Sequence, residues 1–516
     1  MSRLLLLSLF LAIFPVLAQP ALHLKTRTIT PQAGVAVDLV DSPVFFGAGH
    51  LILQFSDPPS PATLAGLDAM GITVLGGIPD NGLLVSLSQP ASLAGFGAVY
   101  AAPLDPSDKI SPLISGGMLS ANGYFLIEFH QDVDLNRARL LIQNLGFEIT
   151  ENPDLNGHQL MVHIADPAQV LSTLKSLAIA DLVEYIFPAS DDLAKGVPSR
   201  PCVGALTTLG AVTQLIPTNG PGWGGPGQNP ATVGYVFSAL TNELAANAAE
   251  AEIQRAMAEW SKIVQVTWKQ SSDAIAPATV NVLFASGSHG DAYPFDGPGG
   301  VLAHTFYPAP PNPEPIAGDM HFDASETWNI GANTDVFSVA LHELGHALGL
   351  GHSDNPADVM YPYYKMVGTL NAGDKATVLT LYAPQTGSTV PSPTPTPTPA
   401  PTPTPTPTPA PAPPAPTPPP NPGGTDTTPP TLSIISPGGT TISTSSPSLM
   451  FEGTASDNTA VASVTWSTNT GTSGTASGTN SWSATIPLLV GSNTVTIRAS
   501  DTAGNVAWRS VVVSRH

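Results

Sequence analysis

The chain has 516 residues, enough for three or four domains, and a formal net charge of -21 although only 11% of its residues are charged. An acidic, sparsely charged surface argues against nucleic acid and anionic membranes as partners. Because Cys202 is the only cysteine, an intrachain disulfide is excluded, and stability must come from apolar cores and bound ions.

The first residues have the pattern of a secretory signal peptide. Arg3 precedes an apolar stretch from Leu4 to Leu17, and small residues end it at Ala18. A membrane anchor is the weaker alternative, because the apolar run is short and contains Pro15. We therefore predict a signal peptide over residues 1–18 and a mature protein that is secreted, extracellular and not membrane-spanning.

Residues 19–200 read as a duplicated α+β module. Two segments share the order β-α-β-β-α-β, with leading strands predicted at 50–55 and 124–129, which suggests two ferredoxin-like units. They resemble the small propeptide domains that precede many secreted proteases. One hypothesis is a folding aid and inhibitor, and the alternative is a permanent accessory domain. His130, His158 and His163 lack ligand spacing and are interpreted as surface or edge-strand histidines.

The strongest motif is H-E-x-x-H-x-x-G-x-x-H, followed by a methionine at Met360. Residues four apart lie on one face of a helix, so His342 and His346 can reach one metal ion, and a turn at Gly349 returns His352 as the third ligand. Three imidazoles leave a zinc position open for water, which Glu343 can hold as general base. The alternative is a chance match on a surface helix with solvated histidines.

The extended motif, with Ser353 after its third histidine, resembles the matrixins, a metzincin family of zinc endopeptidases. The resemblance covers about residues 200–385. It implies a catalytic domain over residues 201–386, built from a twisted mixed sheet and three helices, that hydrolyses protein or peptide substrates. It also implies that Met360 supports the catalytic zinc from below without binding it.

A second cluster resembles the structural metal sites of that family. The implied structural zinc ligands are His289, Asp291, His304 and His321. The implied calcium ligands are the side chains of Asp296, Asp323 and Glu326 and the carbonyls of Gly297, Gly299 and Val301. The family pattern is broken by a proline-rich loop over residues 308–315 and by Thr279, which stands where an acidic ligand is expected. A second calcium involving Asp319 therefore lacks support.

The resemblance also places a substrate cleft and an inhibitor. Leu302 and Ala303 belong to the edge strand against which matrixin substrates lie, and Pro362 and Tyr364 belong to the wall beyond the scissile bond. Cys202 lies where matrixin propeptides carry a Pro-Arg-Cys-Gly run, but here arginine and proline are exchanged and Val203 precedes the glycine. We hold two hypotheses: the Cys202 thiolate caps the zinc, or the thiol is buried and inert.

The remaining chain reads as a linker followed by a C-terminal domain. Residues 387–428 alternate Thr-Pro and Ala-Pro, which predicts an extended linker. Residues 429–516 show short alternating strands, predict an immunoglobulin-like β-sandwich, and resemble bacterial Ig-like modules. This module either binds a polymer, matrix or cell wall or is a spacer or stability domain. An exported adhesion protein on a non-hydrolysing scaffold is the alternative for the whole chain, but such a protein has no need of Glu343.

Overall fold

The computed structural model describes residues 21–31, 39, 49–89, 91–93, 95–117, 122–202, 204–297, 300–385, 426, 428–439, 441–468 and 472–516. The predicted signal peptide, almost all of the predicted linker and the predicted calcium ligand Gly299 lie outside these residues. Within the described ranges, no helix combines the length and the apolar character needed to cross a membrane.

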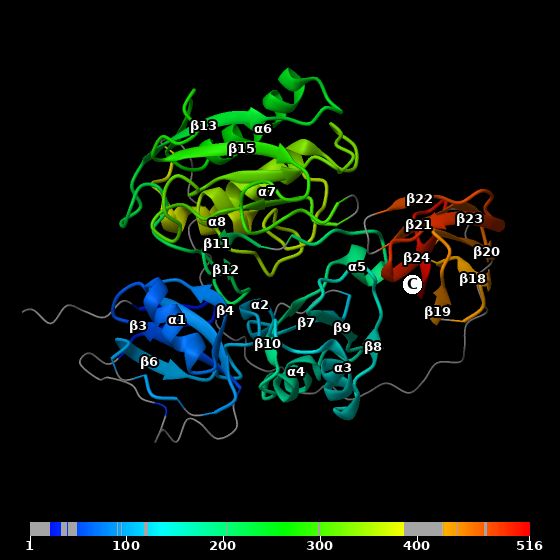
Figure 1. Ribbon diagram of the computed structural model, residues 1–516, viewed down its shortest axis with the longest axis horizontal. Helices are drawn as coiled ribbons and strands as arrows, with labels where there is room; N and C mark the ends of the chain where they lie inside the picture. The colour runs from blue at the N-terminus through cyan, green and yellow to red at the C-terminus, as the bar shows by residue number, and fades with distance from the viewer. Residues whose placement is uncertain are drawn as a thin grey trace, which may run out of the picture.

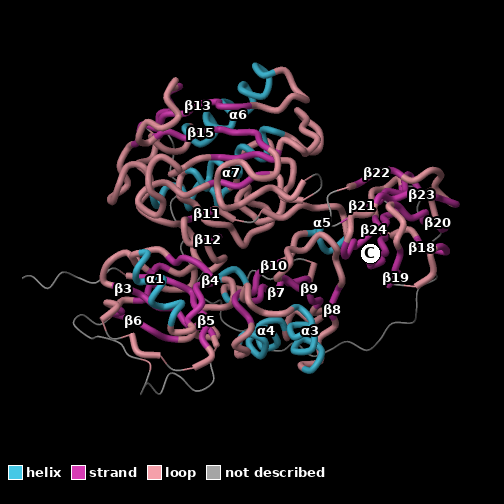
Figure 2. Tube along the Cα trace, viewed as in Figure 1, coloured by secondary structure: helices cyan, strands magenta, loops and turns pink. Residues whose placement is uncertain are grey.

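The N-terminal region contains two four-stranded sheets (Figures 1 and 2). The first unit consists of β3 (His50–Phe55), α1 (Pro61–Ala69), β4 (Ile72–Ile78), β5 (Gly82–Leu87) and β6 (Ala98–Ala102). The second consists of β7 (Tyr124–Phe129), α3 (Leu135–Asn144), β8 (Ile149–Thr150), β9 (Gln159–His163), α4 (Val170–Ala178) and β10 (Val183–Pro188). The strand orders, β6-β3-β5-β4 and β10-β7-β9-β8, are the same, which supports the duplication seen in the sequence.

The first unit differs from the sequence prediction in one respect. A second helix was expected between its third and fourth strands, but the described part of residues 88–97 contains turns and no helix. Gly95 and Gly97 both have positive φ, at 85° and 74°. Since an α-helix needs negative φ at every residue, these two positions interrupt it.

Short elements connect the N-terminal region to the rest of the molecule. They are β1 (Leu22–His23), β2 (Thr28–Ile29), α2 (Pro112–Ser115), α5 (Asp191–Lys195), β11 (Leu206–Thr207) and β12 (Gly210–Ala211). Leu22 of β1 and Ile29 of β2 enter one buried apolar cluster with Tyr185, Tyr361 and Tyr363. The N-terminal region and the loop after the third histidine therefore share a single core.

The predicted catalytic domain contains a five-stranded mixed sheet with the order β14-β13-β15-β17-β16. Its elements are β13 (Ala231–Ala239), α6 (Ala246–Ser261), β14 (Val266–Gln270), β15 (Thr279–Ala285), β16 (Ala303–Thr305), β17 (Met320–Asp323), α7 (Val336–Ala347) and α8 (Ala372–Leu381). Only β16 pairs antiparallel, and it lies at one edge. The described residues thus contain the mixed sheet and the three helices that the sequence predicts.

Helix α6 packs on α7 and fixes its position. Ile253, Met257 and Trp260 recur at helical spacing on α6 and are buried in the apolar core of this domain. The Trp260 indole N–H donates to the carbonyl of Leu341 at 3.0 Å. Because α7 carries two of the motif histidines, this packing determines where those histidines point.

The C-terminal module is entirely β-structure in its described residues. Its strands are β18 (Thr431–Ser436), β19 (Thr441–Thr444), β20 (Ser448–Ser456), β21 (Val461–Thr468), β22 (Ser473–Thr475), β23 (Ser481–Pro487), β24 (Gly491–Asp501) and β25 (Val506–Arg515). They form a three-stranded sheet, β18-β20-β23, and a five-stranded sheet, β19-β25-β24-β21-β22. The module lies beside the second N-terminal unit, next to α5 (Figure 1).

Candidate metal centres and substrate cleft

Helix α7 brings the motif histidines together as the sequence predicts. Its N-cap is Asp335, whose carboxylate accepts a hydrogen bond from the Ser338 amide at 2.9 Å. The His342 and His346 ring centroids are 4.8 Å apart. Gly349, with φ of 102°, turns the chain just after the helix. The His352 ring then lies 4.9 Å from that of His346, so all three rings meet.

The three histidines have the protonation state of metal ligands. His342 Nδ1 lies 2.7 Å from the carbonyl of Val359, and His346 Nδ1 lies 2.8 Å from that of Leu350, so both Nδ1 atoms donate and both Nε2 atoms carry a lone pair. Burial lowers the pKa of His342 to about 4 and holds those of His346 and His352 well below the usual range. The imidazoles are therefore neutral at physiological pH.

Among the three histidines, two Nε2 nitrogens are buried and have no hydrogen-bond partner in the part of the chain that the structure describes. They are Nε2 of His342 and Nε2 of His352. Leaving a buried acceptor unpaired costs about 1–3 kcal/mol, which a bound cation would offset. One ligand atom from each of Cys202, His342, His346 and His352 lies within 4.8 Å of the others, so the group could hold a metal ion.

Glu343 lies beside this group as a buried carboxyl with two side-chain neighbours. The Thr305 hydroxyl donates to Glu343 Oε2 at 2.6 Å. Cys202 Sγ lies 3.9 Å from Glu343 Oε1 and 3.8 Å from His346 Nε2. Burial raises the pKa of Glu343 to about 7, which is the range useful to a general base. Burial also raises the pKa of the Cys202 thiol, and the Glu343 charge adds to that shift.

Met360 packs against α7. A Cβ on Gly345 would lie 2.2 Å from Met360 Sδ, so the glycine makes room for the thioether. Sequence reasoning missed the residue that holds this turn. The Asp374 carboxylate, on α8, accepts the amides of Val359 at 2.9 Å and Met360 at 3.0 Å. Its signal was the capping box that Asp374 forms with Asn371 at the start of the helix.

The second predicted metal group also assembles. Asp291 Oδ2 lies 3.0 Å from Nε2 of both His289 and His304, and 2.8 Å from His321 Nδ1. All four side chains are almost fully buried. Burial lowers the pKa of His304 to about 4. Burial alone would raise the pKa of Asp291, but hydrogen bonds, that with His321 foremost, lower it. Three imidazoles and a carboxylate suit a closed tetrahedral metal site.

The predicted calcium ligands are less well assembled. In the described part of the chain, the groups of three or more potential metal-binding side chains do not include Asp296, Asp323 and Glu326. Glu326 is instead paired with Arg200, because the segment before Cys202 enters the cleft and carries the guanidinium to it. Asp323 Oδ2 is buried without a hydrogen-bond partner among the described residues, whereas Asp296 Oδ1 accepts the Val301 amide at 3.0 Å.

The chain itself occupies the predicted substrate cleft. The amide of Cys202 donates to the carbonyl of Pro362 at 2.8 Å, and the amide of Tyr364 donates to the carbonyl of Arg200 at 2.8 Å. Leu302 and Ala303 line the same pocket, together with residues 200–202. Residues 200–202 thus lie extended between the predicted edge strand and the predicted wall, as a peptide substrate would.

A third group of side chains was not predicted. Asp426, Asp457 and Asp501 gather at one end of the C-terminal module, with one carboxylate oxygen of each within 4.8 Å of the others. Thr459 and Asn505 donate hydrogen bonds to these carboxylates. We assign no ligand to the group.

Comparison with known proteins agrees with the geometry of the two histidine groups. Residues 227–383 match the family model of Matrixin. This segment is a matrixin domain. Residues 23–102 match a domain of unknown function, DUF8729, which covers the first N-terminal unit.

The similar curated proteins are metalloproteinases. Rat (Rattus norvegicus) macrophage metalloelastase is 44% identical over 134 residues, which is 25% of this chain and 28% of that protein. Human (Homo sapiens) matrix metalloproteinase-20 is 38% identical over 159 residues, 30% and 32% respectively. The hatching enzyme of Paracentrotus lividus is 40% identical over 161 residues, 30% and 26%. The chain spans less than a third of the length of each of these relatives.

Proposed function

We propose that this protein is the precursor of a secreted zinc endopeptidase that hydrolyses extracellular proteins. The observation that supports this proposal most directly is that three neutral imidazoles lie together beside the carboxyl of Glu343. Two of them have buried Nε2 atoms without a hydrogen-bond partner among the described residues. A zinc ion held by His342, His346 and His352 would supply Lewis acidity and a water of lowered pKa. Glu343 takes the proton of the attacking water and passes it to the leaving amine, and the main chain at Ala303 helps to hold the oxyanion.

The supporting ions are part of the same proposal. His289, Asp291, His304 and His321 are proposed to hold a structural zinc ion, and Met360 to support the catalytic one. Asp296, Asp323 and Glu326, with the carbonyls of Gly297, Gly299 and Val301, are proposed to bind calcium once Arg200 has left Glu326. The unpartnered Asp323 Oδ2 favours this view.

We further propose that residues 19–200 form an inhibitory propeptide of two ferredoxin-like units, and that Cys202 is the zinc ligand of the latent form. Support comes from the Sγ distance of 3.8 Å to His346 Nε2 and from the segment 200–202 that fills the cleft. On this assignment the catalytic domain covers residues 201–386, followed by a linker and an Ig-like module over residues 429–516.

Hydrolysis of a quenched peptide library tests the enzyme proposal. Wild-type protein, treated by limited proteolysis to remove the N-terminal region, is compared with Glu343→Ala for activity and zinc content. We expect the variant to lose activity and keep its zinc, because Glu343 is not a ligand. A processed, zinc-loaded wild type that cleaves nothing would instead favour a non-hydrolysing binding protein.

Zinc stoichiometry tests the two metal groups separately. We expect two zinc ions per processed wild-type chain and one zinc ion per processed His289→Gln chain. The peptide hydrolysis that depends on Glu343 is measured for both proteins at saturating zinc. A wild-type value of one would contradict the structural zinc.

A further inference from the structure

We propose that the N-terminal region is held on the catalytic domain at a second anchor centred on Asp354, and that after a cut in the connecting chain it stays bound as a noncovalent inhibitor. This inference rests on the proposed function, because inhibition presupposes an enzyme. The anchor itself is a property of the described residues and does not involve the zinc group.

The centre of the anchor is a buried ion pair. Lys25 Nζ lies 2.6 Å from Asp354 Oδ1, and the two side chains are only 8% and 5% exposed. The residues are 329 positions apart, and Asp354 follows His352 by two residues. The pair therefore joins the start of the N-terminal region to the loop that carries the third histidine of the motif.

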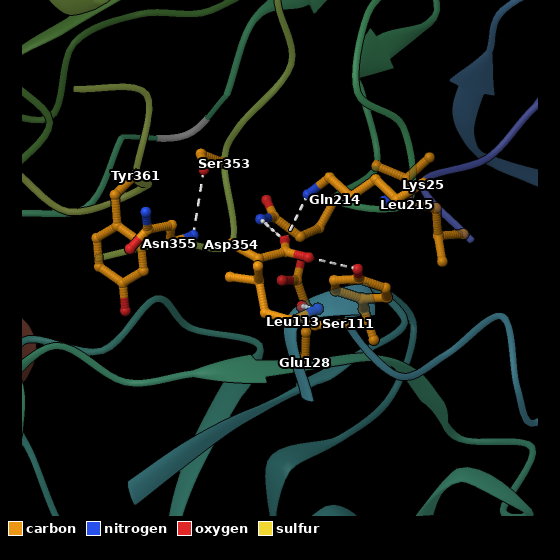
Figure 3. A network of polar contacts seen from close by, with 12 residues as sticks. Lys25, Ser111, Leu113, Glu128, Gln214, Leu215, Ser353, Asp354, Asn355 and Tyr361 are labelled. Carbon is orange, nitrogen blue, oxygen red and sulfur yellow. Dashed lines mark hydrogen bonds and ion pairs between the residues drawn. The ribbon is translucent and has the colours of Figure 1, made fainter. Parts of the chain in front are cut away.

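Other polar groups complete the surroundings of Asp354 (Figure 3). The Tyr185 hydroxyl donates to Asp354 Oδ2 at 2.6 Å, and Gln214 Nε2 donates to Oδ1 at 3.2 Å. Lys25 Nζ also lies 5.2 Å from the centroid of the Tyr185 ring. Burial raises the pKa of nearby Glu128 to about 8, and the carboxylate that forms the ion pair with Lys25 is that of Asp354.

The N-terminal region also forms hydrogen bonds with Tyr361 and Tyr363, which flank Pro362 of the predicted cleft wall. Tyr361 donates to the carbonyl of Pro188 at 3.0 Å and accepts the amide of Ser190 at 3.1 Å. The Tyr363 hydroxyl donates to Gln159 and accepts the amide of Asn156 at 3.1 Å. Both rings are buried in the apolar cluster that contains Leu22, Leu126 and Tyr185.

The apolar contacts and the ion pair contribute to binding in different ways. Burial of the shared apolar cluster supplies affinity, since it would be exposed to water if the two parts separated. A buried ion pair adds little net affinity, because both charges lose hydration. It does make binding depend on Lys25, because removing the cation leaves Asp354 buried and uncompensated. None of these contacts needs an intact chain between the two parts.

The test uses the full chain with a specific protease site inserted between Gly227 and Gln228, in a stretch whose residues 226–230 are exposed. After cutting, we expect the two wild-type fragments to co-elute on size exclusion and to leave a quenched peptide uncleaved. Lys25→Met should shorten the lifetime of the complex by about 30-fold or more, with activity appearing as the fragments separate.

Three comparison variants make the result specific. Arg139→Met removes an exposed ion pair with Glu151 in the same region and should keep the wild-type lifetime. Asp354→Asn should act like Lys25→Met from the opposite side, and uncut samples of both are first checked for cooperative thermal unfolding. Cys202→Ser should still co-elute after cutting, because the anchor is independent of the zinc ligand.

The proposal is overturned if wild-type fragments separate as fast as those of Lys25→Met, or if Arg139→Met has the same effect as Lys25→Met. Loss of co-elution in Cys202→Ser would likewise overturn it, by making the cleft the sole attachment. Co-elution that depends on Lys25 without any activity after separation would uphold the anchor and contradict the enzyme proposal instead.

Discussion

The hydroxyl of Thr305 donates a hydrogen bond to Oε2 of Glu343 at 2.6 Å, and both side chains are buried. Thr305 lies on the edge strand β16 and Glu343 on helix α7, so the bond spans the floor of the cleft. A carboxylate held by one oxygen keeps the other in a fixed place. In the proposed enzyme, Thr305 is therefore a positioning residue for the general base.

Thr305→Val should lower kcat/KM of the processed enzyme by about tenfold or more, the value of one hydrogen bond to a charged group. Peptide hydrolysis is measured with zinc content, because Thr305 follows His304. Thr305→Ser, which keeps the hydroxyl, should recover most of the activity. Equal losses in Val and Ser, or loss of zinc in Val alone, would assign Thr305 a purely structural role.

Cys202 should contribute only part of the latency. Even without its thiol, residues 200–202 keep their main-chain bonds to Pro362 and Tyr364. We expect uncut Cys202→Ser to show less than about a tenth of the processed activity, and Cys202→Ser with Lys25→Met to show about tenfold more than either variant alone. Initial rates on uncut protein check this, and full activity from Cys202→Ser alone would refute it.

A histidine pair between the two N-terminal units predicts a pH effect. His50 stacks on His130 with ring centroids 3.8 Å apart, and its nitrogens lie 2.8 Å from Asp181 and 2.9 Å from Asp132. Burial opposes protonation of His50, but the two carboxylates outweigh it and raise its pKa. Burial lowers the pKa of His130, although Glu184 faces it, and Lys109 adds to the lowering.

A raised histidine pKa stabilises the fold below the unfolded value of about 6.5, and the contribution disappears as the pH rises through the folded pKa. His50→Gln should therefore lower Tm most near pH 6, with the difference from wild type shrinking towards pH 8. His130 acts in the opposite direction, so His130→Gln is the control. Thermal unfolding of wild type and both variants across this pH range tests the prediction. A Tm difference between wild type and His50→Gln that grows with pH would contradict it.

The C-terminal module should depend on Arg498 for its position. Arg498, on β24, is buried and paired with Asp154, whose other oxygen accepts the Ser199 amide at 3.2 Å. Arg498→Met leaves Asp154 without this cation, and Asp154 also holds the chain at Ser199. We therefore expect an added protease to cut the chain near Gly196 about tenfold faster in the variant. Arg509→Met, at an exposed neighbouring position, is the control. Limited proteolysis and the radius of gyration in solution measure the outcome.

Patterns that lie within one element were readable from the sequence. His342, Glu343 and His346 share one helix whose period fixes their faces, and Gly349 marks the turn to His352. The histidines of the second metal group were placed by the family motif, and the structure brings them together. The alternating strands of the C-terminal module were likewise predicted from their period of two.

His130 shows where such reasoning fails. Its lack of ligand spacing suggested a surface or edge-strand position, yet it is fully buried against His50. The partner lies on β3 of the other unit, so the sequence around His130 carries no sign of it.

The sequence by itself determined the chemistry that we propose for this protein, because the H-E-x-x-H-x-x-G-x-x-H motif is local and needs only one helix and the turn at Gly349. Tertiary structure alone decided which distant residues contact the motif and its surroundings. The contacts of Lys25 with Asp354, Thr305 with Glu343 and Arg200 with Glu326 each join surfaces from distant parts of the chain. Such pairs depend on how separately formed elements pack, and no local periodicity records that packing.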